Sequence, residues 1–326
     1  MKQRDNRVDF YKGMLMWGVI WGHTITCLLQ GAPNEVGIHP IFRTYDMPFF
    51  MLISGYFFSF SMKKYSFMDL IKNKITTIAL PTILWTFISS KFSSIFSGYY
   101  FLWAVFLSSV VLCTINKIIP NKRWQIPIHI LIILVFHFQP YPLVNMPYLF
   151  PYFVLGYYGY EWMYNLKIRP LYILPFFIGG LCFWRIDFNI WNAGADFSGG
   201  GIFLLYATLF RTFIALSGIV IAKWLFDILY RELSENHSLL CRFIVDCGKE
   251  TLALYILHVI VLSWIVRKLV SLMTGILDYN IFEINHLLLG YFIAPLLSLG
   301  IMMLMMWGIK WSKKNRYTDK LFGFKI

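Results

Sequence analysis

Apolar stretches follow one another along the whole chain and are separated by short polar turns. A membrane-spanning helix needs about 20 predominantly apolar residues. On that criterion we place helices at 8–30, 42–62, 75–97, 101–119, 125–138, 147–166, 170–185, 201–226, 249–271 and 287–310. The segments 125–138 and 170–185 fit least well, the first because it is short and contains Pro127. The pattern predicts an all-α, polytopic transmembrane bundle of about ten spans.

The positions of the basic residues test this count independently. Cytoplasmic loops of membrane proteins retain Lys and Arg. Most of the 29 basic residues fall in alternate loops, on the side that also holds both ends of the chain. The alternation predicts an even number of spans, with the N and C termini in the cytoplasm.

Composition supports a membrane protein and excludes an ordinary soluble enzyme. Hydrophobic residues make up 58% of the chain and charged residues only 14%, against about 25% charged in soluble domains. The net charge of +13 fits attraction to anionic lipid headgroups or to a polyanionic substrate, and it requires no nucleic acid. The five cysteines are scattered, so we expect free thiols and no metal site. We expect residues 1–326 to form a single domain.

The first apolar segment carries three ionisable side chains on one stripe. At about 100° per residue, Lys12 lies within about 20° of His23 and Asp9 within about 40°. His23 stands roughly 16 Å above Lys12 along a straight helix, so the two cannot pair. Charged side chains in a membrane helix are costly and usually face a bundle interior or a wet cavity. We interpret the stripe as the wall of an internal polar path.

Four blocks of sequence stand out in order along the chain. They are Asp9–Gly13 followed by Gly22-His23; Tyr45–Phe58; Lys72-Asn73-Lys74 with Leu80-Pro81 and Trp85; and Gly248–His258. Together the blocks resemble the integral-membrane acyltransferase-three family, whose members O-acylate bacterial surface glycans. In the second block, Asp46 stands where that family commonly has His before Met-Pro.

The resemblance implies roles for the residues of the first and third blocks. His23 is the candidate base, because imidazole titrates near neutral pH, and it could act directly or carry the acyl group transiently. Asp9 would orient Lys12 one turn away. Lys12, Lys72 and Lys74 would seat the phosphates of an acyl-CoA donor at the cytoplasmic mouth.

Four further positions, Arg211, Asp46, Arg43 and His258, are candidates for the acceptor side of the site, where they would bind the acceptor or the oxyanion. Arg211 lies near the middle of the eighth predicted span, where its charge requires an acidic partner or contact with water. Asp46 and Glu161 are the expected partners. Arg211 could bind an acceptor or an oxyanion, or form a structural ion pair. His258 could act directly or bond across helices. Arg43 is expected at the outer face.

The leading hypothesis is a bacterial inner-membrane O-acyltransferase. It would move an acyl group, with acetyl the commonest, from cytoplasmic acyl-CoA to a glycan hydroxyl. We expect no tightly bound cofactor, and partners limited to membrane lipid, acyl-CoA and the glycan acceptor. The alternatives are a secondary transporter or exporter of a lipid-linked glycan, with the buried charges as a coupling relay, and a structural membrane subunit.

Overall fold

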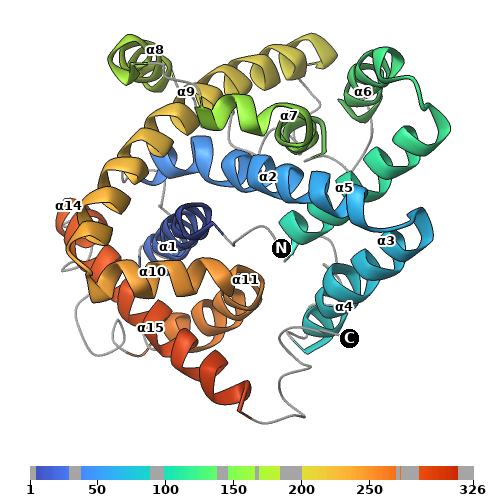
Figure 1. Ribbon diagram of the computed structural model, residues 1–326. Coiled ribbons are helices and arrows are strands. Elements are labelled where there is room, and N and C mark those ends of the chain that lie inside the picture. Colours follow the sequence, from blue (N-terminus) through green and yellow to red (C-terminus); the bar gives the residue numbers. More distant parts are fainter. Residues whose placement is uncertain are drawn as a thin grey trace. The chain divides into compact units, whose positions relative to one another are not determined.

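A computed structural model gives the fold (Figure 1). It describes residues 5–28, 38–88, 99–137, 146–165, 169–183, 200–268, 272 and 286–314. Within these ranges the regular structure is helical throughout, and three short segments are π-helices rather than α-helices. The all-α prediction is therefore confirmed for the described part of the chain.

Each of the ten predicted apolar segments coincides with helix, over all or part of its length. The helix that contains the eighth segment, 201–226, extends beyond it to Glu235. The elements are α1 (Asn6–Leu28), α2 (Ile38–Lys64), α3 (Phe67–Lys74), η2 (Ile75–Ala79), α4 (Leu80–Ile88), α5 (Tyr100–Ile118), α6 (Lys122–His137), α7 (Met146–Asn165), α8 (Pro170–Cys182), α9 (Gly200–Glu235), α10 (Leu239–Lys249), α11 (Thr251–Ile260), η7 (Val261–Val266), α14 (His286–Leu288), η8 (Leu289–Ile293) and α15 (Ala294–Ser312).

The described residues include three helices that are long and apolar enough to cross a membrane. These are Tyr100–Ile118, Leu209–Glu235 and Leu289–Ser312. A bent pair, Leu239–Lys249 with Thr251–Val266, passes the same test if it is counted as one broken span. The apolar helices thus support a membrane protein, and the count of ten spans stays a prediction.

The chain divides into two compact units. Unit 1 comprises Met1–Asp46 and Ala222–Ile326, and unit 2 comprises Met47–Ile221. The two boundaries fall inside α2 and α9.

In unit 1, α1 packs against α10, α11 and α15 (Figure 1). Apolar side chains on most sides of α1 are buried, including Phe10, Leu15 and Ile20. Two glycines let α1 and α10 meet backbone to backbone. A Cβ on Gly13 would overlap the carbonyl of Ile244, and a Cβ on Gly248 would overlap the carbonyl of Asp9. This contact fixes the start of α1.

In unit 2, α7 packs against α5, α6 and the second half of α2. Two glycines again bring backbones together, since a Cβ on Gly55 would overlap the carbonyl of Phe153 and one on Gly156 the carbonyl of Leu52. The rings of Tyr56 on α2 and Tyr160 on α7 are stacked, with centroids 4.0 Å apart.

Candidate active site

The first site residues lie at the start of α1, where Asp9 and Lys12 form an ion pair. Lys12 Nζ lies 2.7 Å from a carboxylate oxygen of Asp9, one helical turn away. Asp9 is only 2% exposed. A buried carboxylate needs a partner of opposite charge, and the spacing of three residues supplies one from the same helix face. The predicted pair is present.

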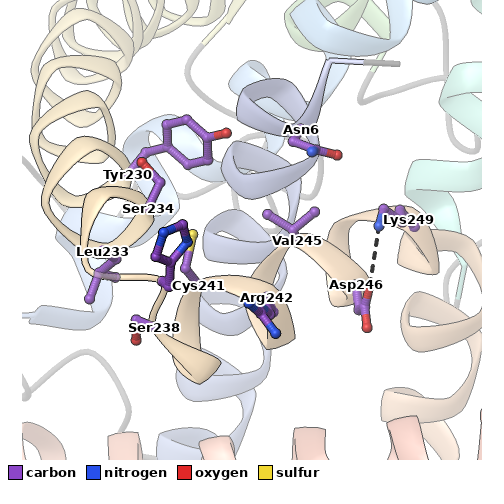
Figure 2. A pocket seen from close by; sticks show the side chains of 11 residues that line it. Asn6, Tyr230, Leu233, Ser234, Ser238, Cys241, Arg242, Val245, Asp246 and Lys249 are labelled. Carbon is purple, nitrogen blue, oxygen red and sulfur yellow. Dashed lines mark hydrogen bonds and ion pairs between the residues drawn. The ribbon is translucent and has the colours of Figure 1, made fainter. Parts of the chain in front are cut away.

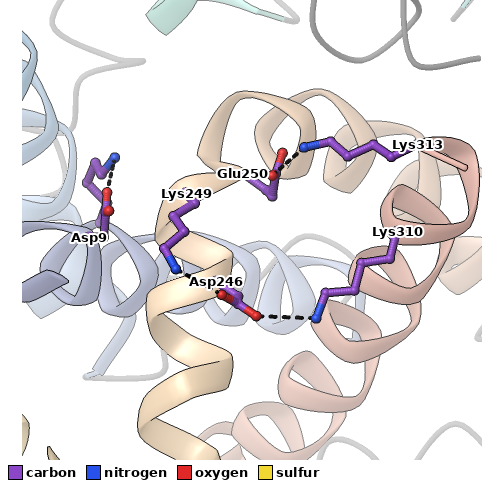
Figure 3. A network of polar contacts seen from close by, with 7 residues as sticks. Asp9, Asp246, Lys249, Glu250, Lys310 and Lys313 are labelled. Carbon is purple, nitrogen blue, oxygen red and sulfur yellow. Dashed lines mark hydrogen bonds and ion pairs between the residues drawn. The ribbon is translucent and has the colours of Figure 1, made fainter. Parts of the chain in front are cut away.

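Lysines from other helices surround this end of unit 1 (Figure 3). Asp246 on α10 accepts from Lys249 Nζ at 3.2 Å and from Lys310 Nζ at 3.3 Å. Glu250 pairs with Lys313, which directly follows α15. Asp246, Lys310 and Lys313 were not expected as site residues from the sequence, because they lie more than 200 residues from Asp9 along the chain.

A second carboxylate ties α1 to the end of α9. Asp227 accepts a hydrogen bond from Arg7 Nε at 2.7 Å and from Lys223 Nζ at 2.9 Å. Tyr11 also donates its hydroxyl to Asp227. Arg7 and Tyr11 both lie on α1, so their bonds to Asp227 fix the rotation and the height of α1 against α9 in unit 1, whereas Lys223 binds the same carboxylate from within α9.

A pocket lies beside this end of α1, between the end of α9 and α10 (Figure 2). Its volume is about 390 Å³. Polar side chains from all three helices line it, among them Tyr230 and Ser234 from α9 and Arg242 and Lys249 from α10. The chain enters α10 here through His237, whose φ of 47° breaks the helix, and Ser238, whose side chain caps α10.

The two histidines singled out in separate blocks lie side by side in unit 1. The ring centroids of His23 on α1 and His258 on α11 are 5.2 Å apart, with the planes tilted by 42°. His23 is half-buried and His258 is 1% exposed. Tyr255 covers His258 at a centroid distance of 5.0 Å, and Arg43 is near enough to act on His258 electrostatically. The fold therefore brings the first and fourth blocks together.

Two π-helices hold α1 on either side of His23. Trp21 Nε1 donates to the carbonyl of Gly290 in η8 at 2.9 Å. Cys27 Sγ contacts the carbonyl of Leu262 in η7 at 3.6 Å. A π-helical turn changes the direction of backbone carbonyls and is frequent at functional sites. Trp21 and Cys27 escaped sequence reasoning because neither the indole nor the thiol stands out in an apolar helix.

The two basic residues of the third block, Lys72 and Lys74, lie in unit 2. Lys72 is exposed, whereas Lys74 is partly buried with Nζ 5.3 Å from the ring centroid of Phe58. Burial lowers the pKa of Lys74 to about 8. Ser66 caps the N-terminus of α3, the helix that carries both lysines, and Trp85 of the same block is buried.

The predicted charged residues of the acceptor side are placed as follows. Asp46 is 3% exposed and lies at the end of the unit 1 part of α2, next to Tyr45. Arg211 is buried in unit 2, with its guanidinium over the ring of Tyr148. The side chain of Glu161 lies outside the described residues. Pairing of Arg211 with Asp46 or Glu161 stays a prediction.

Comparison with known families covers nearly the whole chain. The profile of a family described as an acyltransferase domain matches residues 5–311. The chain belongs to this acyltransferase family. The match includes all four sequence blocks and extends over both compact units.

Two curated relatives of this chain carry the name nodulation protein NolL. The protein of Mesorhizobium japonicum is 28% identical over 182 residues, which cover 47% of this chain and 47% of the relative. That of Sinorhizobium fredii is 26% identical over 225 residues, 58% of this chain and 60% of the relative. The chain thus spans about half the length of the curated relatives it matches. No solved structure matches the chain.

Proposed function

We propose that this chain is a multi-pass O-acyltransferase of the bacterial inner membrane, which moves an acyl group, acetyl foremost, from cytoplasmic acyl-CoA to a hydroxyl of a cell-surface or lipid-linked glycan. The observation that carries the proposal is the pairing of His23 with His258 on helices that the acyltransferase family match includes. The ten-span topology with both termini in the cytoplasm belongs to the same proposal.

In this proposal, His23 is the general base. As the acceptor oxygen attacks the thioester carbonyl, His23 takes the hydroxyl proton, and the C–O bond forms. The C–S bond then breaks, and the leaving thiolate takes the proton back from the imidazolium to give free coenzyme A. Transfer through an acyl-imidazole on His23 would use the same residues and differ by one covalent step. His258 is a positioning residue, whose ring fixes the orientation of His23.

The donor would enter from the cytoplasmic side, where the sequence predicts the lysines to lie. Lys12 is held by Asp9 beside a set of further lysines in unit 1, and Lys72 and Lys74 add positive charge in unit 2. Ammonium groups are ordinary ligands of phosphate, so these residues are proposed to bind the phosphates of acyl-CoA. The proposal needs no tightly bound cofactor or metal.

The test is the mass spectrum of the surface glycans from a strain lacking this gene. We expect the glycan to remain and to lose one acyl mass per modified unit, and a plasmid copy to restore it. Loss of the entire glycan would contradict the proposal and favour an exporter of a lipid-linked glycan. An unchanged spectrum would also contradict it.

The lowered pKa of Lys74 predicts a pH dependence of donor use. A lysine with a pKa of about 8 carries its charge below that pH and loses it above, whereas an ordinary lysine stays charged to about pH 10. We expect kcat/KM for acetyl-CoA to fall several-fold between pH 7 and 9. Lys74→Arg keeps the charge throughout this range, so the fall should disappear in that variant. The same fall in Lys74→Arg would assign the titration to another group.

A further inference from the structure

Arg211 is a buried cation surrounded by aromatic side chains. It lies on α9 within unit 2 and is 4% exposed. Its Cζ lies 4.0 Å from the ring centroid of Tyr148, so the planar guanidinium covers that ring. Tyr100 and Tyr152 are also close enough to act on its charge. Tyrosine rings favour a cation weakly but supply no negative charge to neutralise it.

The hydrogen bonds of Arg211 are incomplete on one side. A guanidinium has five N–H donors. The hydroxyl of Tyr148 interacts with the group, but Nε and Nη2 have no hydrogen-bond partner among the described residues. These two nitrogens form one edge of the planar group. Their N–H bonds point in parallel and fit two oxygens of one carboxylate or phosphate.

An unpaired guanidinium inside an apolar helix bundle is costly, and buried ionisable residues in membrane segments are functional-site candidates by default. Arg211 also lies in Leu209–Glu235, one of the helices long and apolar enough to cross a membrane. A neutral hydroxyl would satisfy one donor and leave the charge unbalanced. An anionic group with two oxygens would satisfy both donors and the charge.

We propose that Arg211 and the ring of Tyr148 form a binding site for an anionic group of the acceptor, a carboxylate or a phosphate held by Nε and Nη2. The assignment of this anionic group to the acceptor rests on the proposed function. The acceptor is then an anionic glycan: an acidic sugar supplies a carboxylate, and a lipid-linked glycan supplies a phosphate.

The first measurement is the melting temperature of the purified full-length protein in detergent, without ligand. Arg211→Met removes a buried charge whose Nε and Nη2 have no partner among the residues that the structure describes, so we expect an unchanged or higher melting temperature without ligand. A structural ion pair predicts the opposite, since removing one partner would leave a buried acid alone. A lower melting temperature in Arg211→Met would therefore overturn the proposal.

The second measurement is ligand binding by the protein in lipid nanodiscs. The probes are glucuronate against glucose, and farnesyl phosphate against farnesol. We expect one of the two anions to bind and its neutral counterpart not to. Binding of glucuronate would identify the source as an acidic sugar, and binding of farnesyl phosphate as a lipid carrier. Arg211→Lys, which keeps the charge but loses the two-donor edge, should weaken binding at least tenfold, and Arg211→Met should abolish it.

Arg231→Met is the matched control, because Arg231 is an exposed arginine on the same helix. It should bind the anion as the wild type does. The proposal is overturned if neither anion binds, or if binding survives in Arg211→Met. It is also overturned if Arg211→Met loses binding of coenzyme A, because the site would then serve the donor. Anion binding by a protein that transfers no acyl group would refute the proposed function and leave this site standing.

Discussion

Replacing His23 by alanine is expected to abolish acyl transfer. The variant loses the base that accepts the hydroxyl proton, and general base catalysis contributes about 10²- to 10⁴-fold. His23→Gln should be equally inactive, because an amide can form hydrogen bonds but cannot take a proton at neutral pH. The measurement is acetyl transfer from labelled acetyl-CoA in membranes, with protein abundance determined in the same samples.

Thr26→Ala on the same helix is the control for His23. The Thr26 hydroxyl donates to the carbonyl of Gly22 one turn earlier, at 3.1 Å, so its removal should leave activity within a few-fold of wild type. Full activity in His23→Ala would discard the mechanism. Lost activity in Thr26→Ala would show that α1 tolerates no change, and the effect at His23 would then carry no chemical meaning.

Replacing Gly248 by alanine is expected to destabilise unit 1 by about 3 kcal/mol or more, as overpacking against rigid backbone does. The new Cβ would overlap the Asp9 carbonyl, and backbone on a packed helix cannot move aside as a flexible side chain can. Any accommodation would shift α10 from α1 and disturb the Asp9–Lys12 pair. Thermal unfolding of the purified protein in detergent measures the change.

Gly300 and Gly308 on α15 provide controls in the same unit. A Cβ at either position would meet no heavy atom within 4 Å. Alanine favours a helix over glycine by about 1 kcal/mol, so Gly300→Ala and Gly308→Ala should be as stable as wild type or slightly more so. A Gly248→Ala protein as stable as these two would contradict the close contact of α1 with α10.

The sequence determined the positions of the helices and the local chemistry. Continuous apolar runs indicate helix because helix satisfies every backbone hydrogen bond within the segment, which lipid requires. The Asp9–Lys12 pair followed from the spacing of three residues, which places both side chains on one helix face. The four blocks were sufficient to indicate the acyltransferase family, and the family profile confirms it.

Only the tertiary structure decided which distant residues meet. His23 and His258 are in contact although they lie 235 residues apart along the chain. The hydrophobic periodicity within either helix does not indicate this contact. Helices that are apolar on nearly every side do not show which face is buried. The π-helical turns at η7 and η8 and the unpartnered edge of Arg211 likewise depend on packing between segments. Local sequence encodes the helix, and the meeting of helix faces creates the site.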